Sequence, residues 1–493
     1  MSRKSYWPRL VLGVMLGLAA LVAQAEERFY LQIGVFSDAA TATGIRQQIE
    51  SFGFNVSQRQ VEVIGRPAFV VLVGPYARSR EALYDKNRLA DVGWSAAVKR
   101  YPAPPKPKPP KPPTFRTTYS GSLAGEVRHF TDAPLYSTEQ HETTASLAIQ
   151  PEFHISWNQR SSSLTFVPFV RVGDADEERN HADIRELMWL NAWDDWELRL
   201  GVGKVFWGVT ESRHLVDVIN QVDLVENTDE EDKLGQPMAN LSWFSDWGTF
   251  DVFALPLFRE RSFPGEEGRL RGPLVVDTEQ DAIYESPDEE NHLDWAVRWS
   301  HYIGDWDIGV SHFSGTGRDP RFVPGLNAQG QPVLIPRYNL IDQTGLTLQA
   351  IMGEWLWKLE ATSTRELDQR YTEAVAGFEY TRVGIFRSAI DLGFIAEYLY
   401  DERGEQAPQP FEDDVMLGLR WAFNDMQSSE ILMGVIIDRD GTATSSSVEA
   451  SRRLGQSWRL TLEYRGLHAV EPQDISYLLR NDNYIQLGLG YYY

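Results

Sequence analysis

The chain has 493 residues, no cysteine and a formal net charge of -23 at pH 7, from 47 Lys and Arg against 70 Asp and Glu. The missing cysteine excludes disulfides and thiolate metal sites. The acidic charge argues against nucleic-acid partners, because phosphates would be repelled. A mean hydropathy of -0.35 excludes a bundle of membrane-spanning helices. The 16 Trp residues are many, and they need a buried or membrane-facing place.

Charge divides the chain into two parts. Residues 1–115 contain 16 basic and 8 acidic residues, a net of +8, so the rest carries a net of -31. The change falls at a proline tract, which indicates two different modules. The sequence predicts a signal peptide over 1–25, a small domain over 26–101, a Pro-rich linker over 102–115 and a large β-barrel over 116–493.

The first residues have the pattern of an export signal. Arg3, Lys4 and Arg9 precede the apolar run 10–22, and Ala23-Gln24-Ala25 supplies a small-x-small cleavage site. The run is shorter than the roughly 20 residues of a spanning helix. An uncleaved anchor is the alternative.

The small domain reads as a ferredoxin-like α/β layer. Strand-like runs alternate with helical spacing in the order βαββαβ, which puts two helices on one face of a four-stranded sheet. The expected strands cover 29–35, 58–64, 69–73 and 96–100, and the expected helices cover 39–53 and 78–89.

Three stretches of this domain, 31–36 (LQIGVF), 69–76 (FVVLVGPY) and 79–82 (SREA), resemble the SPOR domain family. The resemblance implies binding to the glycan strands of peptidoglycan, and the family's glutamine on the first strand falls on Gln32. Tyr30 shares the face of Gln32 by period 2 and would offer a ring to a sugar. Val35 and Ala68 depart from the family pattern, so a fold kept without its ligand is the alternative.

The linker contains 8 of the 26 prolines within residues 102–113. Such a tract favours polyproline II, at about 3.1 Å per residue, and acts as a stiff spacer.

The remainder alternates with the period of β-strands. Apolar and polar residues take turns over segments of about ten residues with aromatic ends, and short turns alternate with long connections, as in a membrane barrel. We therefore expect a mostly β chain with a large transmembrane antiparallel barrel of about 18 strands, or 16 as the fallback. A soluble β-sandwich is the alternative.

The last residues resemble the outer-membrane assembly signal, a C-terminal aromatic with apolar residues at every second position before it. This implies an outer-membrane location with the small domain in the periplasm, and the barrel assembly machinery as a partner. More loosely, residues 203–208 (GKVFWG) and 218–220 (VIN) resemble porin-like families. The signal residues are Ile485, Leu487, Leu489, Tyr491 and Tyr493.

Charged residues on the polar face of the predicted strands are candidate pore-lining residues. They would set a transverse field for polar solutes, or simply neutralise one another. The long segment 207–235, with its apolar residues between 215 and 219, would fold inward as a constriction. The candidates are Glu197, Arg199, Asp294, Arg298, Lys358, Glu360, Arg420, Arg459, Glu463 and Arg465.

Acidic clusters at 229–232 and 288–290 are expected in outer loops, where divalent cations could bridge them to lipopolysaccharide. Solvated acidic loops are the alternative. Outer-membrane lipids surround the barrel in either case.

These patterns predict a porin-like channel or export barrel tethered to peptidoglycan. A closed barrel that serves as a structural tether is the second hypothesis, and a barrel enzyme is the third. The sequence contains no HExxH, P-loop or nucleophile-elbow motif, so we expect no enzyme, no cofactor and no metal site.

Overall fold

The structure, a computed structural model, describes residues 27–63, 66–102, 115–137 and 140–493. The predicted signal peptide (1–25) and residues 103–114 of the predicted linker lie outside the described part of the chain. The chain divides into two compact units, Met1–Pro112 and Pro113–Tyr493. Each unit is described by itself.

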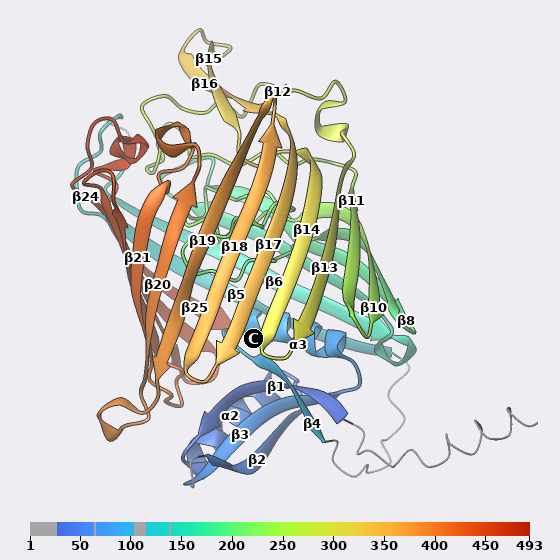
Figure 1. Cartoon of the computed structure of the whole chain (residues 1–493). Coiled ribbons are helices and arrows are strands. Elements are labelled where there is room, and N and C mark those ends of the chain that lie inside the picture. The colour runs from blue at the N-terminus through green and yellow to red at the C-terminus, as the bar shows by residue number, and fades with distance from the viewer. Residues whose placement is uncertain (1–26, 64–65, 103–114, 138–139) are drawn as a thin grey trace, which may run out of the picture. The chain divides into compact units, whose positions relative to one another are not determined.

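The N-terminal unit has the predicted βαββαβ order (Figure 1). Its four strands form one antiparallel sheet in the order β2-β3-β1-β4. The Asp38 carboxylate caps helix α2 by accepting the backbone N–H of Thr41 at 2.7 Å. The elements are β1 (Glu27–Phe36), α2 (Ala39–Ser51), β2 (Val56–Val63), β3 (Arg66–Tyr76), α3 (Ser79–Asp91) and β4 (Ala97–Pro102).

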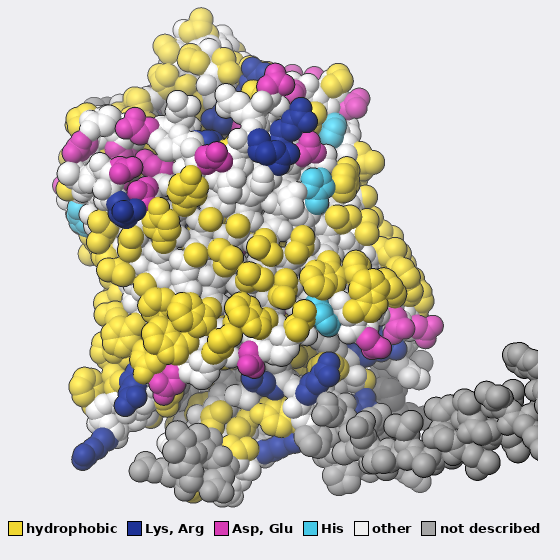
Figure 2. Space-filling view, viewed as in Figure 1, with side chains coloured by type: hydrophobic (Ala, Val, Ile, Leu, Met, Phe, Trp, Pro, Cys, Tyr) yellow, Lys and Arg dark blue, Asp and Glu magenta, His cyan; other side chains and the backbone are white. Residues whose placement is uncertain are grey.

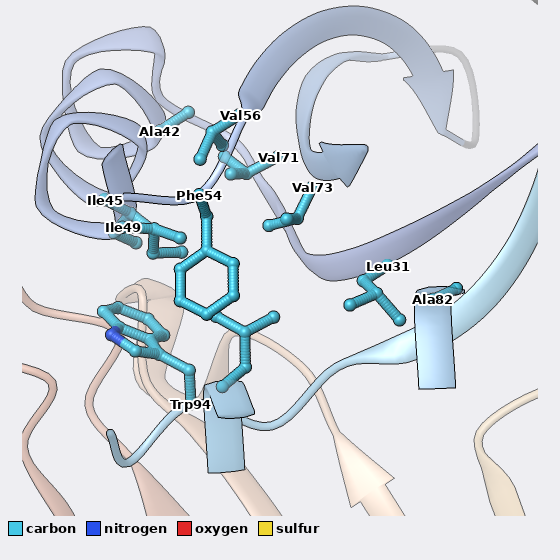
Figure 3. Packing of buried hydrophobic residues seen from close by; sticks show 11 residues of the cluster. Leu31, Ala42, Ile45, Ile49, Phe54, Val56, Val71, Val73, Ala82 and Trp94 are labelled. Carbon is cyan, nitrogen blue, oxygen red and sulfur yellow. The ribbon is translucent and has the colours of Figure 1, made fainter. Parts of the chain in front are cut away.

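One face of this sheet packs against both helices and forms a closed apolar core. Alternate residues of β1, β2 and β3 meet the helices there, and Trp94 closes one end (Figure 3). The unit therefore has a core of its own, and the opposite sheet face carries a second, smaller apolar cluster of Tyr30, Val70 and Leu72. The buried core residues are Leu31, Ala42, Ile45, Ile49, Phe54, Val56, Val71, Val73, Ala82, Leu89 and Trp94.

The C-terminal unit is a closed antiparallel barrel, and its strand count confirms the predicted 18 (Figure 1). The last strand pairs with the first, with Tyr484 opposite Phe130 and Tyr492 opposite Ser122. The strands are β5 (Phe115–Phe130), β6 (Thr143–Trp157), β7 (Ser162–Gly173), β8 (His181–Trp193), β9 (Trp196–Gly203), β10 (Gln236–Ser245), β11 (Gly248–Leu255), β13 (Asp294–Ile303), β14 (Trp306–Thr316), β17 (Leu340–Met352), β18 (Trp355–Glu366), β19 (Gln369–Arg382), β20 (Asp391–Asp401), β21 (Asp413–Ala422), β22 (Glu430–Asp438), β23 (Thr444–Leu454), β24 (Trp458–His468) and β25 (Tyr484–Tyr492).

The outer wall is apolar, because side chains of a strand alternate between the two faces of the sheet. In β25, Ile485 and Leu487 are 45% and 51% exposed, whereas the inward Tyr484 is fully buried. Figure 2 shows, on the face in view, a hydrophobic band across the barrel, with acidic and basic side chains above and below it. The face that would meet lipid is thus the face that the alternation predicts.

Short and long connections lie at opposite ends of the strands. Turns such as 194–195 and 353–354 join strands at one end, and connections such as 204–235 and 256–293 lie at the other. The long connection between β14 and β17 has secondary structure of its own. It contains the hairpin β15 (Arg321–Leu326) and β16 (Pro332–Tyr338), which joins β12 (Ile283–Tyr284) in a small sheet beyond the barrel. Pro324 and Gly325 in β15 conceal the strand pattern there.

In the described part of the chain, no helix is both long enough and apolar enough to cross a bilayer.

Candidate functional site

The connection 204–235, between β9 and β10, folds into the barrel as its apolar residues predict. Val216 and Ile219 are each 1% exposed and pack with Trp207 against inward side chains of the wall. This constriction segment therefore rests on an apolar patch of the inner wall. The wall residues of the patch are Met188, Met238, Phe253, Leu255, Ala296 and Phe313, from strands β8 to β14.

Two side chains hold the segment's own fold. Asn220 accepts the backbone N–H of Val205 at 2.8 Å and donates to the carbonyls of Gly203 and Leu234. The Asp217 carboxylate accepts the backbone N–H of Trp207 at 2.6 Å. These bonds hold the segment where it leaves β9 and where it returns to β10. Its conformation is therefore fixed by side chains rather than by the backbone pairing of β-strands.

Two buried glutamates hold the tip of the segment from another part of the wall. Glu360 of β18 is 0% exposed and accepts the backbone N–H groups of Val209 and Thr210 at 2.6 and 3.0 Å. Glu397 of β20 accepts those of Glu211 and Ser212, both at 2.8 Å. Charge-assisted bonds to backbone donors are strong when buried, so these carboxylates fix the tip.

Ion pairs add to this attachment. The Glu211 carboxylate lies 3.3 Å from Lys358 Nζ and 2.7 Å from Arg420 Nη2, both on the inner wall. Arg213 pairs with Glu373 of β19 at 3.3 Å. The segment thus crosses the lumen and is bound by charged groups of β18 to β21.

A third attachment joins the segment to strands at the barrel seam. Asn227 donates to Glu463 at 3.1 Å, and Asp229 pairs with Arg465 at 2.8 Å. The acidic cluster predicted over 229–232 includes Asp229, which is exposed and pairs with the inward Arg465. The cluster belongs to the constriction segment, and the inward Arg465 draws its first carboxylate to the inner wall.

All ten predicted pore-lining residues lie on the inner face of the wall. Five of them contact the constriction segment directly through the bonds described above: Lys358, Glu360, Arg420, Glu463 and Arg465. A sixth, Arg298, lies over the ring of Trp207, which also belongs to the segment. The remaining four pair with groups of the wall and loops: Glu197 with Arg199, Asp294 with Arg318, and Arg459 with Glu430.

Glu373 and Glu397 were missed by sequence reasoning. Both sit at inward positions of strands that alternate as clearly as the others, so the strand period alone would have found them. Arg318 was missed as well, because it lies in a connection with no period.

His214 lies between two carboxylates at the tip of the segment. Its Nε2 is 2.8 Å from Glu231, and its Nδ1 is 3.7 Å from Glu360. Burial disfavours the charged imidazole, but these two carboxylates outweigh it and raise the pKa of His214 to about 10. Burial raises the pKa of the neighbouring Asp217 to about 6.

A polar cavity opens beside the segment. It has a volume of about 90 Å³, enough for several water molecules. Basic and acidic side chains both line it, so a hydrated polar solute rather than an apolar one suits it. Its lining includes Arg213, Lys233, Arg261, Arg321, Glu373 and Arg403.

The candidate glycan-binding residues lie on the sheet face of the N-terminal unit that is turned away from its helices. Tyr30 is 1% exposed: the Arg59 guanidinium lies 4.8 Å from its ring centre, and Tyr101 packs on it edge to face. Gln32 is partly exposed and accepts a 2.9 Å hydrogen bond from the Tyr101 hydroxyl. Tyr30 thus offers no open ring, whereas the Gln32 amide remains accessible.

Residues 25–100 match the family model of the SPOR domain. The N-terminal unit is a SPOR domain. The match covers the sheet and both helices described above, so the resemblance read from three stretches of sequence is confirmed. A comparison with curated proteins found no match for the chain.

Among solved structures, the barrel is similar to porins at low identity. The matches include a chain from a study of asymmetric conductivity of engineered proteins and a mutant of the Rh. blastica porin, each at 11% identity and TM-score 0.39. Both cover 77% of this chain and 100% of their own. Salmonella typhi OmpF in complex with daunomycin matches at 8% identity and TM-score 0.40, over 77% of this chain and 98% of its own. At these values the matches carry no conclusion about solute or mechanism.

Proposed function

We propose that the protein is an outer-membrane channel for small hydrated solutes, narrowed by the constriction segment and tethered to peptidoglycan by its SPOR domain. The observation that carries the proposal is a closed 18-strand barrel with an apolar outer wall, a charged inner wall and one segment crossing its lumen. A barrel of this size leaves room for an aqueous path unless a segment fills it.

The inner wall supports passage of polar rather than apolar solutes. Charged residues of both signs face the lumen, and the cavity beside the segment is lined by them. Charged side chains that line a pore orient dipolar solutes and let ions pass from one binding site to the next. The proposal assigns the protein no enzymatic activity and no cofactor.

The tether supports a location in which the SPOR domain reaches the cell wall from the periplasmic side. SPOR domains bind peptidoglycan, and the proposed contact here is the partly exposed Gln32 on the sheet face turned away from the helices. We propose lipopolysaccharide, outer-membrane lipids and the barrel assembly machinery as further partners of the barrel.

Single-channel recording in planar bilayers tests the channel. We expect small conductance steps from the wild-type protein and larger steps from the double variant Glu360→Gln and Glu397→Gln. In the double variant, each new side-chain amide would direct an N–H donor toward backbone N–H groups of the segment. An unpaired buried donor costs about 1–3 kcal/mol. We therefore expect the tip of the constriction segment to leave the barrel wall.

The matched control is Glu354→Gln, the same change in an exposed turn where the carboxylate accepts from the Tyr380 hydroxyl. Steps of equal size in all three proteins would contradict the role of the constriction segment. Silence in both the wild type and the double variant would instead favour the second candidate, a closed barrel that serves only as a tether. The dense bonding of the segment is the observation that keeps this candidate open.

A further inference from the structure

Inward side chains are buried over much of the barrel wall. On β18, Lys358 and Glu360 are buried where the tip of the constriction segment bonds to them. On β8 to β14 and on β19 to β21, inward apolar residues form two buried clusters, and both clusters pack against residues of the segment. These parts of the wall are therefore covered.

Four neighbouring strands, β23, β24, β25 and β5, differ from the rest of the wall. Most of their inward positions are partly or fully exposed, although they face the lumen, and Thr461 and Ser120 are fully exposed. These four strands are described over their whole length, and none of them contributes to the two apolar clusters. An inward side chain that remains exposed indicates a water-filled space inside a wide barrel. We call these four strands the open arc.

The constriction segment meets the open arc in the half of the strands nearer the long connections. The contacts there include the bond from Asn227 to Glu463 and the ion pair of Asp229 with Arg465. Nearer the short turns, the inward residues are small. Thr461 lies opposite Ser451 on one side and Gly488 on the other. A side chain at position 488 would meet the Thr461 hydroxyl, so the glycine keeps the wall low at this point.

We propose that solutes cross the barrel along the open arc, between its strands and the constriction segment. The proposal rests on the channel function proposed above and adds the route. Hydroxyl groups such as those of Ser451, Thr461 and Ser120 can exchange hydrogen bonds with a solute or its water shell, so the route suits small hydrated solutes. The polar cavity of about 90 Å³ beside the segment is the competing route, and residues of β17 to β19 line it.

The charge that a solute meets on the open arc is negative. The side chain of Glu449 on β23 is 48% exposed, whereas that of Arg465 is 22% exposed. Arg465 pairs with Asp229, Glu449 and Glu463 at 2.8, 2.6 and 3.0 Å. Within the described part of the chain, the other hydrogen-bond partners of these three carboxylates are neutral side chains or backbone. One guanidinium therefore serves three carboxylates, and the route favours hydrated cations and neutral solutes over anions.

An introduced thiol tests the route, because the chain contains no cysteine. Thr461→Cys and Ser120→Cys each place one thiol on the open arc. The full-length protein is recorded in planar bilayers before and after addition of trimethylammonium-ethyl methanethiosulfonate, which attaches a bulky cation to a reachable thiol. We expect the reagent to lower the conductance of both variants by about half or more, because the attached group narrows the path.

The matched control is Thr347→Cys, the same change at a buried inward threonine of β17. We expect the reagent to leave this variant and the wild type unchanged, and heat-modifiable migration shows that each variant has folded. A conducting Thr461→Cys and Ser120→Cys that the reagent does not affect would overturn the route, as would a block of Thr347→Cys. A wild-type protein that does not conduct would reject the channel function itself.

Glu449→Gln tests the charge on the route. We expect this variant to show a weaker cation preference than the wild type in reversal potentials at low salt, and Glu449→Asp to keep the preference. Glu354→Gln, in an exposed turn, is the control and should behave as the wild type does. An unchanged preference in Glu449→Gln would overturn the role assigned to Glu449.

Discussion

Single inward carboxylates decide where the constriction segment lies. Glu360 by itself accepts hydrogen bonds from the backbone N–H groups of Val209 and Thr210 and from the Thr210 hydroxyl. These three bonds constrain the segment more than a single ion pair would. The sequence singled out Glu360 as pore-lining from the strand period. It could not show what Glu360 binds, because its partners lie about 150 residues away in a connection without periodicity.

At the same scale, the charge of His214 predicts an alkaline transition. Its pKa in the folded protein, about 10, is above the ordinary value of about 6.5. The stabilisation from its ion pairs is complete below pH 6.5 and is lost as the pH rises through 10. We expect wild-type conductance to change near pH 10, and His214→Gln to show no such step. The measurement is single-channel recording between pH 7 and 11.

The SPOR domain gives another residue-level prediction. Gln32→Ala should weaken binding of the domain to amidase-treated sacculi by about 1 kcal/mol or more, the value of a hydrogen bond whose partner is left unpaired. Tyr101→Phe is the control, because it removes the hydroxyl that bonds Gln32 and keeps the amide. A pelleting assay measures both. Failure of the wild-type domain to pellet would remove the tether from the proposed function.

Among the elements, strand β25 lies at the seam of the barrel. Tyr493 follows it, exchanges backbone bonds with Gly121 at 3.1 and 3.2 Å, and places its ring 5.2 Å from Tyr119 of the first strand. The residue predicted as an assembly signal thus also closes the seam of the barrel.

Substitution of Tyr493 separates these contributions. Tyr493→Ala removes the ring and should lower the fraction of heat-modifiable barrel in the outer membrane. Tyr493→Phe keeps the ring and loses only the 3.0 Å bond to the Tyr119 hydroxyl, so it should assemble nearly as well. Equal assembly of Tyr493→Ala and wild type would show that the aromatic ring is dispensable.

Strands were more predictable than connections, for a physical reason. A wall strand must alternate along its whole length, since one face meets an apolar and the other a polar environment. The outer hairpin of β15 and β16 has no such constraint. Val323, Pro324 and Gly325 do not alternate between polar and apolar, so the sequence does not distinguish the two faces of the hairpin. The inward path of the constriction segment was predicted from its apolar residues, but its bonds to Glu397 and Glu373 were not.

For the whole molecule, charge predicts selectivity. The barrel part carries a net of -31, with acidic residues concentrated in its long connections. We expect the channel to prefer cations, and we expect this preference to grow as the salt concentration falls. At physiological salt, charges more than about 8–10 Å from a passing ion are screened from it, and this screening weakens at low ionic strength. Reversal potentials in a salt gradient measure it. Anion preference at low salt would mean that the inward arginines dominate.

Cell fractionation tests the proposed location of the whole chain. The apolar outer wall and the assembly residues predict heat-modifiable protein in the outer-membrane fraction. Full-length protein found in the inner membrane would contradict the proposal.

The pairing of β25 with β5 sets an order of events for folding. Tyr484 lies opposite Phe130, so the barrel closes only when residues more than 350 positions apart along the chain meet. Contacts of that separation form late, because a long loop must be ordered first. The SPOR domain has its own core and, among the residues that the structure describes, shares no strand with the barrel, so it can fold while the rest of the chain is still emerging. We therefore expect the N-terminal domain to be folded before the barrel closes.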